Sequence, residues 1–214
     1  MVAAGRGDRA RTSPEDLPKQ FRQVAGRAVV AWSADLLRTA GCGPIVLVAP
    51  AAHLDTARSL VEDVLVVAGG DTRSESVLRG LEHVRSDRVV IHDAVRPCAS
   101  PRLVRGVLEA LGDADGAASA LPVEETLKRV APDGRIEETV EREGMWRTQT
   151  PQAFRTDALR AAYESVPTPA TDEAQVLERS GRKVVVVRGE RTNVKVTFPE
   201  DLDLAAALLG RSRR

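Results

Sequence analysis

Short runs of small, mostly β-branched apolar residues alternate along this chain with segments of mixed polarity. Five such runs predict strands, at 45–49, 64–68, 88–92, 116–121 and 183–187. The runs are almost continuously apolar, which is typical of strands covered on both faces rather than of strands with one face in water.

The segments between these runs carry helical patterns. Thr72 and Glu75 form a predicted capping box, which is followed by an apolar face of Val77, Leu81 and Val84. Strands that alternate with helices predict an α/β fold with a mostly parallel sheet, covered by helices.

A second capping box is predicted near the C-terminal end, from Thr197 and Glu200 with Pro199 in the first turn. The residues after it show helical spacing at i, i+3, i+4 and i+7, namely Leu202, Ala205, Ala206 and Leu209. They predict a C-terminal helix with one apolar face.

One segment, at about 122–150, departs from this alternation. Two polar, alternating runs flank a Pro-Asp-Gly turn at 132–134, which predicts a β-hairpin. The hairpin has little apolar surface to bury against a sheet, so it is interpreted as a protruding arm that is either a flap or a contact with a second subunit. No linker divides the chain, and 1–214 is predicted to form a single domain.

The amino-acid composition argues against several classes of function. Lys+Arg and Asp+Glu balance at 31 each, so the whole-chain charge favours neither nucleic acid nor a membrane, and the 3% aromatic content argues against a base-stacking surface. Cys42 and Cys98 stand alone, which predicts free thiols in a reducing compartment and argues against a zinc site. The N-terminal stretch lacks the apolar core of a signal peptide, and no apolar run is long enough to cross a bilayer. A cytoplasmic protein is expected.

Polar clusters follow three of the predicted strands: "GGDTRSES" after Ala68, "HDAVRP" after Ile91 and "RTNVK" after Val187. In open α/β sheets ligands bind at the carboxyl ends of the strands, so these clusters are expected to meet at one site. The opening segment "VAAGRGDR" would make a fourth.

The opening segment is either an ordinary turn or a phosphate cradle. Gly5 and Gly7 alone favour a turn, but small neighbours, Arg9 and the "PKQ" that contains Lys19 make a loop of amide N–H groups and positive charge suited to a triphosphate. The spacing is not that of a Walker A loop. A strand usually has about 5–6 residues, and only four precede Gly5. Either the first strand is truncated in this sequence or a short strand suffices.

Two other motifs each allow two interpretations. Asp93 with Arg96 is either a cap or surface ion pair, or a carboxylate near a metal-bound phosphate beside an anion-binding Arg. Gly69 and Gly70 belong either to a simple capped turn or to a surface on which a base lies. The three His residues are scattered and are interpreted as structural. No general base is evident, which suits a phosphate nucleophile that is already ionised and needs only alignment and charge neutralisation.

Seven strings occur in the order typical of one family: "VAAGRGDR…LPKQF", "AGGDTRSES", "HDAVRP", "ETLKR", "TVEREGMWRTQTPQAF", "ATDEAQVLE" and "TNVKVTFPEDL". Over nearly its whole length the chain resembles 2-C-methyl-D-erythritol 4-phosphate cytidylyltransferases. The resemblance implies a Rossmann-like nucleotidyltransferase fold and a homodimer interlocked by the arm. It implies transfer of CMP from CTP to the polyol phosphate with release of pyrophosphate, with Mg²⁺, in non-mevalonate isoprenoid biosynthesis.

The resemblance also assigns roles to individual residues. Arg9 and Lys19 match the pair that stabilises the transition state at the α-phosphorus, and Arg142 and Lys195 match catalytic positions that hold the acceptor phosphate. The positions that match the CTP pocket are Ala3, Ala4, Gly5, Gly7, Gly70, Asp71, Arg73 and Ser76. Those that match the surroundings of the sugar phosphate are Asp93, Arg96, Thr126, Arg142, Thr150, Thr171 and Lys195.

The chain departs from the family pattern in its short first strand, in a longer stretch at 8–18, and in Val95 where Ala is usual. Ribitol 5-phosphate cytidylyltransferases are similar and remain an alternative, as does a catalytically inactive nucleotide-binding homologue. Some relatives are fused to a cyclase, and this chain is expected to carry the transferase half.

Overall fold

The computed structural model describes residues 1–5, 17–166 and 170–211. Its centre is a twisted sheet built from β3 (Ile45–Ala49), β4 (Val64–Ala68), β5 (Arg88–Ile91), β6 (Gly116–Pro122), β9 (Trp146–Arg155) and β10 (Val184–Arg188). The five strands predicted from apolar runs are confirmed, each within one residue at either end.

The strands lie in the order β4, β3, β5, β9, β6, β10, with Val2 between β3 and β5. β3 pairs with β4, and β6 with β10, in parallel, whereas β9 runs antiparallel to both β5 and β6. All strands except β9 therefore point the same way, and the predicted mostly parallel α/β sheet is confirmed. Strand β9 was not predicted, because the arm predicted at about 122–150 included its first half.

The first residues of the chain join the two halves of this sheet. The N–H of Val2 donates to the carbonyl of His92 (2.9 Å), and the N–H of Ala94 donates to the carbonyl of Val2 (2.9 Å). On the other side the N–H of Ala3 donates to the carbonyl of Val48 (2.8 Å). Three residues thus act as the central strand between β3 and β5.

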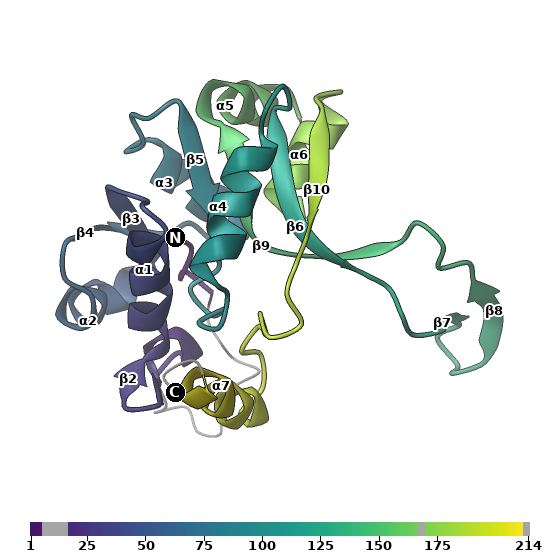
Figure 1. Cartoon of the computed structure of the whole chain (residues 1–214), viewed down its shortest axis with the longest axis horizontal. Coiled ribbons are helices and arrows are strands. Elements are labelled where there is room, and N and C mark those ends of the chain that lie inside the picture. The colour runs from purple at the N-terminus through teal and green to yellow at the C-terminus, as the bar shows by residue number, and fades with distance from the viewer. Residues whose placement is uncertain (6–16, 167–169, 212–214) are drawn as a thin grey trace.

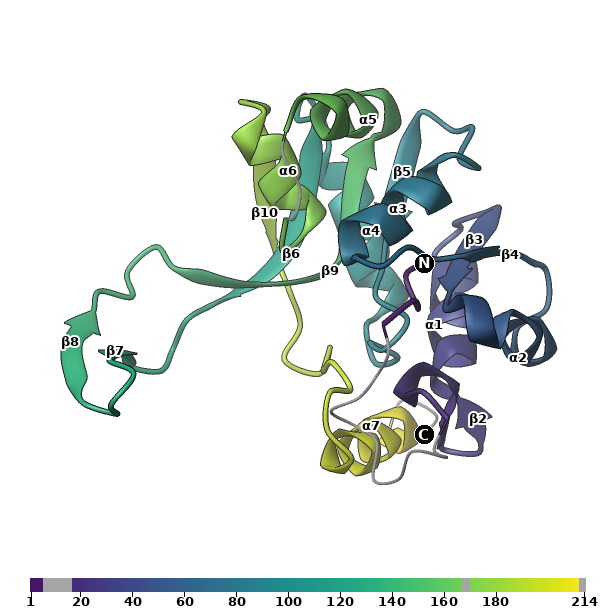
Figure 2. The same ribbon diagram turned by 180° about the vertical axis from the view of Figure 1, so that it is seen from behind.

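Helices cover both faces of the sheet (Figures 1 and 2). One face carries α1 (Val29–Thr39), α2 (Leu54–Leu60) and α4 (Pro101–Ala110), and the other carries α3 (Arg73–Leu81), α5 (Thr156–Ser165) and α6 (Glu173–Arg179). Burial of a large apolar side chain stabilises a fold by roughly 1.5–3 kcal/mol, and the fully buried ones include Leu47, Val104, Phe154, Leu159 and Leu177.

Smaller elements complete the fold. The helical turns Lys19–Phe21 and Ala51–His53 and the two-residue strands β1 (Gln23–Val24) and β2 (Arg27–Ala28) flank α1 and α2. The C-terminal helix α7 (Glu200–Arg211) packs its Ala205 and Leu209 against Val24 and Val29. This is the apolar face predicted from the sequence.

Of the two predicted capping boxes, one forms in part and the other does not form. At α3 the Thr72 hydroxyl accepts from the N–H of Glu75 (3.1 Å), although the Glu75 carboxylate accepts from Asp71 rather than from Thr72. At α7 the predicted box is wrong. The Asp201 carboxylate accepts from the N–H groups of Thr197 (2.7 Å) and Phe198 (2.8 Å), because one side chain in the first turn can satisfy both donors.

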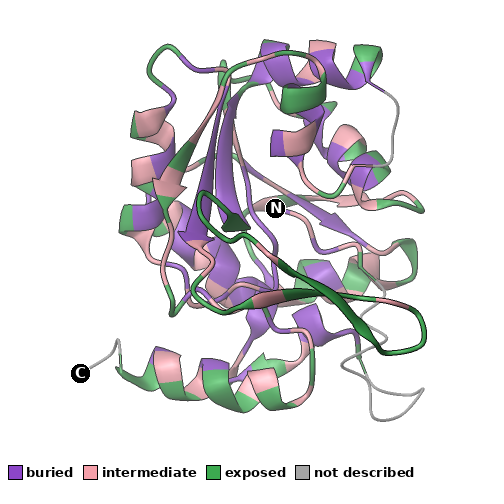
Figure 3. Cartoon of the chain, turned by 90° about the vertical axis from the view of Figure 1, so that its right-hand side faces the viewer, coloured by how far each residue is buried: buried purple, intermediate pink, exposed green. Residues whose placement is uncertain are grey.

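The predicted arm is present, as β7 (Leu127–Val130) and β8 (Ile136–Val140), and it projects away from the sheet (Figure 1). Gly134 closes the turn between them with a φ of +86°, a conformation that favours glycine. Nearly the whole arm is exposed (Figure 3). The exposed side chains include four large apolar ones, namely Val130, Ile136, Met145 and Trp146.

Candidate functional site

Asp93 is the centre of a cluster of charges at the carboxyl edge of the sheet. It follows β5, and its backbone N–H donates to the Thr150 hydroxyl at the middle of β9 (2.9 Å). Its carboxylate lies 2.8 Å from the ammonium of Lys195, 3.5 Å from Arg73 and 3.8 Å from Arg96. Three separate polar clusters of the sequence therefore meet at one carboxylate, as their positions after strands predict.

The electrostatics of Asp93 follow from this arrangement. Burial favours a raised pKa, but the positive charges of Lys195, Arg73 and Arg96 outweigh it and hold the pKa of Asp93 well below its usual range. The carboxylate is thus ionised at neutral pH. Asp93 keeps only 7% of its surface exposed, whereas the Lys195 side chain is 42% exposed, so the carboxylate of this pair is buried and the ammonium reaches solvent.

Arg73 is held by two residues that sequence reasoning missed. Its guanidinium lies 2.5 Å from the carboxylate of Glu173, which also accepts from the Tyr163 hydroxyl (3.1 Å). Glu173 is 1% exposed, and burial raises its pKa, an effect that the charge of Arg73 offsets in part. Glu173 lies within the "ATDEAQVLE" string, so the family pattern included this residue but did not show that it pairs with Arg73.

The turn between β4 and α3 is a tightly packed capped turn. The N–H of Gly70 donates to the Ser76 hydroxyl (3.1 Å), which donates in turn to the carbonyl of Thr72 (2.9 Å). A Cβ on Gly69 would lie 2.3 Å from the Cβ of Ala4, and one on Gly70 would lie 2.4 Å from that of Glu75. Both positions require glycine because the turn is closely packed. At Gly69 the close neighbour is Ala4, so the turn packs directly against the opening segment.

The opening segment is fixed from the other side by Gln20. This side chain, 1% exposed, donates to the carbonyls of Ala3 (2.6 Å) and Gly5 (3.0 Å). Lys19, also buried, precedes it in the same helical turn. Ala4 is half-buried and Gly5 is exposed. The predicted site residues Gly7 and Arg9 lie outside the described residues.

Buried amides hold the loop that carries Lys195. Asn193 donates to the carbonyl of Thr150 (2.8 Å), and Arg96 donates to the carbonyl of Asn193 (2.9 Å). Gln149 donates to the carbonyl of Glu190 (3.0 Å). These bonds tie the 190–195 loop to β9 and to the Asp93 segment.

A cavity of about 500 Å³ opens beside this loop. Lys195 and Arg96 line it together with Arg147 and Arg191, and the acidic side chains on its wall are Glu124, Glu125 and Asp201. The mixture of charges, with a surplus of cations, suits a polar anionic ligand.

Other predicted residues lie apart from the Asp93 cluster. Asp71 is exposed at the start of the β4–α3 turn, where its N–H donates to Glu75 (2.8 Å). Thr171 is exposed before α6 and hydrogen-bonds with Gln175. Thr126 and Arg142 lie on the projecting arm, where Arg142 donates to the carbonyl of Glu124. Thr126 and Arg142 therefore lie on the arm (Figure 1), whose base lines the cavity together with Lys195 and Arg96 through Glu124, Glu125 and Arg147.

His92 is structural, as expected. It is fully buried, its Nε2 lies 3.2 Å from the carbonyl of Arg96, and burial lowers its pKa to about 4. The described residues contain no group of three or more His, Cys, Asp or Glu side chains that could hold a metal ion. Across the same residues, no helix combines the length and apolar character needed to cross a membrane.

Known proteins resemble this chain over nearly its whole length. The family model for 2-C-methyl-D-erythritol 4-phosphate cytidylyltransferase matches residues 1–211. The Paraburkholderia phymatum protein of that name is 42% identical, over 99% of this chain and 95% of its own length. A bifunctional IspD/IspF enzyme of Ruegeria is 38% identical over 98% of this chain, which spans only 55% of that enzyme's length.

Solved structures show the same fold. The 4-diphosphocytidyl-2C-methyl-D-erythritol synthase of Anaerococcus prevotii has a TM-score of 0.83 at 31% identity, covering 98% of this chain and 96% of its own. The 2-C-methyl-D-erythritol 4-phosphate cytidylyltransferase of Thermus thermophilus has a TM-score of 0.81 at 34% identity and covers 97% of both chains. The fold is that of a nucleotidyltransferase. The chain belongs to the 2-C-methyl-D-erythritol 4-phosphate cytidylyltransferase family.

Proposed function

We propose that this chain transfers CMP from CTP to 2-C-methyl-D-erythritol 4-phosphate and releases pyrophosphate. The observation that carries the proposal is the cluster of Lys195, Arg73 and Arg96 around Asp93, at the ligand-binding edge of a fold shared with cytidylyltransferases. A set of solvent-accessible cations held by one buried carboxylate is suited to two phosphorylated ligands brought together.

The chemistry is a displacement at phosphorus. A phosphate oxygen of the acceptor attacks the α-phosphorus of CTP, a new P–O bond forms, and the bond to the β-phosphate oxygen breaks with its electrons leaving on pyrophosphate. The acceptor phosphate is already ionised near neutral pH, so no side chain has to remove a proton. Catalysis then depends on alignment and on neutralising the charge that develops in the transition state.

CTP binds where the opening segment meets the β4–α3 turn. The backbone of Ala3, Ala4 and Gly5 forms the described part of the phosphate cradle. The family pattern adds Gly7 to the CTP pocket and gives Arg9 and Lys19 the role of stabilising the charge at the α-phosphorus. Gly70, Asp71, Arg73 and Ser76 line the rest of the CTP pocket, and Thr150 and Thr171 complete the acceptor side. Packing between Gly69 and Ala4 and the Gln20 hydrogen bonds keep the cradle and the turn in contact.

A divalent cation fits this site as a companion of CTP. Mg²⁺ is typically bound by one or two carboxylates together with substrate phosphates, and Asp93 is a carboxylate at the required edge of the sheet. When bound, Mg²⁺ would neutralise charge on the triphosphate. In its absence Asp93 orients Lys195 and Arg73.

The acceptor phosphate binds to Lys195 in the 500 Å³ cavity, with Arg142 supplied by a second copy of the chain. Arg142 and Thr126 lie on an arm that projects from the body and carries exposed apolar side chains. Such an arm is suited to packing against a second copy. A homodimer would bring Arg142 of one subunit to Lys195 of the other.

Pyrophosphate release tests the reaction. The chain is incubated with CTP and Mg²⁺ and with one polyol phosphate at a time, including ribitol 5-phosphate. We expect release with 2-C-methyl-D-erythritol 4-phosphate at a kcat/KM well above that with every other acceptor. A preference for ribitol 5-phosphate, or no release with any acceptor, would overturn the proposal.

Mixed dimers test the shared site. Arg142→Ala and Lys195→Ala are each expected to lose most activity as homodimers. If Arg142 acts on the neighbouring subunit, a mixed dimer of the two variants contains one site with both residues intact, and mixing restores activity. If Arg142 acts within its own chain, each site of the mixed dimer has one defect and nothing is restored.

A further inference from the structure

Strand β9 is irregular at the point where it reaches the Asp93 cluster. Its pairing with β6 shifts register between Ala118 and Ala120, so residues 149–151 of β9 stand opposite Ser119 alone. We refer to residues 149–151 as the β9 bulge. Bulges re-aim side chains and are common next to active sites. The backbone groups of such a segment need partners outside the ladder.

Side chains supply those partners. The Ser119 hydroxyl donates to the last carbonyl of the β9 bulge (2.8 Å), the Asn193 amide to the middle one (2.8 Å), and the Gln152 amide to the first (3.2 Å). All three donors are almost completely buried. Asn193 belongs to residues 189–195, which we call the Lys195 loop. The bulge and this loop are therefore bonded to each other in the interior.

Two side chains of the β9 bulge hold the two members of the Asp93–Lys195 ion pair. The Thr150 hydroxyl accepts from the N–H of Asp93 (2.9 Å). The Gln149 amide pairs with the backbone of Glu190 as a neighbouring strand would, since its Nε2 donates to the carbonyl (3.0 Å) and its Oε1 accepts from the N–H (3.2 Å). One bulge thus sets both sides of an ion pair that measures 2.8 Å.

The Lys195 loop has a second anchor, at the N-terminus of α4. The Glu190 carboxylate accepts from the N–H of Ser100 (3.0 Å) and from its hydroxyl. A negative charge is favoured at this end of a helix. The loop also lies close against the bulge, because a Cβ on Gly189 would be 2.3 Å from the Oε1 of Gln149. Both anchors act a few residues ahead of the lysine that faces Asp93.

We propose that Gln149 and Glu190 are positioning residues for the transfer reaction, which act on the acceptor phosphate through Lys195 by fixing its loop between β9 and α4. The inference rests on the proposed function, because it takes Lys195 as the group that binds this phosphate. Glu190 is not among the residues that line the 500 Å³ cavity, and the Gln149 amide is already bonded to the loop.

The charge of Glu190 makes the test sharp. If this carboxylate acted on the acceptor only by its charge, Glu190→Ala would remove a repulsion and improve acceptor binding. If it positions the loop, Glu190→Ala should impair acceptor use. We expect kcat/KM for the acceptor to fall on the order of 10²-fold, as for other small misplacements of a reacting group, with the KM for CTP unchanged. Gln149→Met, which keeps the length of the side chain and removes its hydrogen bonds, should act in the same way.

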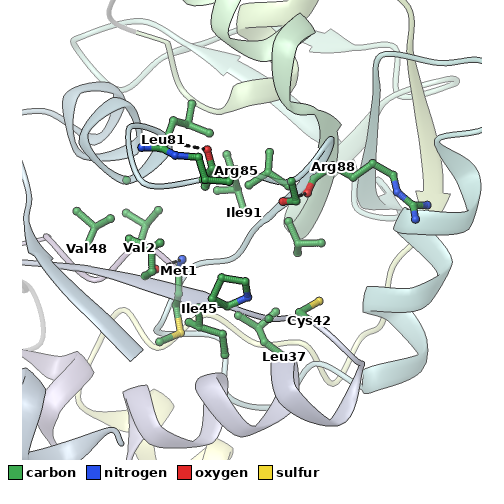
Figure 4. Close-up of a pocket in the computed structure, with 18 of the residues that line it drawn as sticks. Met1, Val2, Leu37, Cys42, Ile45, Val48, Leu81, Arg85, Arg88 and Ile91 are labelled. Carbon is green, nitrogen blue, oxygen red and sulfur yellow. Dashed lines mark hydrogen bonds between the residues drawn. The ribbon is translucent and has the colours of Figure 1, made fainter. Parts of the chain in front are cut away.

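Ile45→Val is the control for a general loss of stability. Ile45 lines the other cavity, of about 610 Å³ beside Met1, which has no lining residue in common with the cavity of Lys195 (Figure 4). This variant should melt at a lower temperature and keep both kinetic constants. In a Lys195→Ala background, Gln149→Met should add little further loss of acceptor use, because the two changes remove the same contact.

Chemical labelling reads the loop without turnover. The chain is acylated at its lysines in the absence of substrates, and mass spectrometry compares Lys195 with the exposed Lys183. An ammonium held at a carboxylate is a poor nucleophile, so Glu190→Ala and Gln149→Met should raise the labelling of Lys195 relative to Lys183, whereas Ile45→Val should not.

The outcomes separate the two proposals. Absence of pyrophosphate release by the unaltered chain with every acceptor refutes the proposed function, and the labelling still reports on the loop. Unchanged labelling of Lys195, improved or unchanged acceptor use by Glu190→Ala, or full multiplication of the losses in the Lys195→Ala background overturns the positioning role. Should Gln149→Met fail to fold, the half-buried Glu190 decides the question by itself.

Discussion

Arg73 and Glu173 are 100 residues apart in sequence and meet at 2.5 Å, with the carboxylate almost completely buried. Arg73 begins α3 and Glu173 begins α6, and these helices lie on the same face of the sheet. The pair therefore fixes the direction of a guanidinium that also approaches Asp93. We expect Glu173 and Tyr163 to be positioning residues, which act on ligands through Arg73.

Glu173→Gln should weaken both the fold and CTP binding. The substitution leaves Arg73 without its nearest charged partner, and loss of such a bond to a buried group typically costs about 1–3 kcal/mol. Urea unfolding measures the first effect and calorimetry with CTP the second. Tyr163→Phe is the matched control, since it removes one hydrogen bond to the same carboxylate and should cost only about 1 kcal/mol. A Glu173→Gln variant with unchanged stability and CTP affinity would refute the positioning role.

Lys19→Ala should lower turnover more than it weakens CTP binding. A donor aimed at charge that grows in the transition state is typically worth on the order of 10²–10³ in kcat. Steady-state kinetics separate kcat from the KM for CTP. Lys183→Ala, which removes an exposed lysine beside β10, should leave both parameters unchanged. Near-normal turnover of Lys19→Ala with only a raised KM would show that Lys19 binds CTP without acting on the transition state.

Gly69→Ala should disturb the contact between the β4–α3 turn and the opening segment. The new methyl group would lie 2.3 Å from the Cβ of Ala4 and 2.9 Å from the Ser76 hydroxyl, so the backbone must shift. Overpacking of this kind costs about 1–3 kcal/mol, and we expect a matching fall in melting temperature together with weaker CTP binding. Gly210→Ala is the control, because its Cβ would have no neighbour within 4 Å. Equal melting of the two variants would argue against a rigid turn.

The chain that begins at Met1 should become more stable as the pH rises from about 6 to 8. Burial lowers the pKa of the Met1 amine from 8.0 to about 6, so in this window the unfolded chain binds more protons than the folded one. A shift of two pKa units corresponds to roughly 2–3 kcal/mol. The charged or titratable neighbours are Asp93, Cys42 and His92. The carboxylate stays ionised in this window, the raised pKa of Cys42 keeps its thiol protonated, and His92 stays neutral.

Denaturant titrations at pH 6, 7 and 8 measure this dependence. An N-terminally acetylated form serves as the control, because it has no amine to titrate and should lack this contribution. If both forms gain the same stability across the window, the amine is not the cause.

The amino-acid sequence alone determined the local elements of this protein. Apolar runs specify β3, β4, β5, β6 and β10, because a strand covered on both faces needs apolar side chains at every position. Turn chemistry specifies the arm, since Pro, Asp and Gly in succession suit a hairpin turn whatever surrounds them. Polar clusters after strands likewise marked the edge at which Asp93, Arg96 and Lys195 meet.

Only the tertiary structure decided which distant strands and side chains contact one another. Strand β9 has no apolar pattern of its own, and it is a strand because β5 and β6 leave a place between them. The contact between Arg73 and Glu173 likewise depends on elements far apart in the chain. Residue type limits the bonds that a side chain can form, whereas the choice among distant partners is made only when the packed layers bring particular groups within a few ångströms.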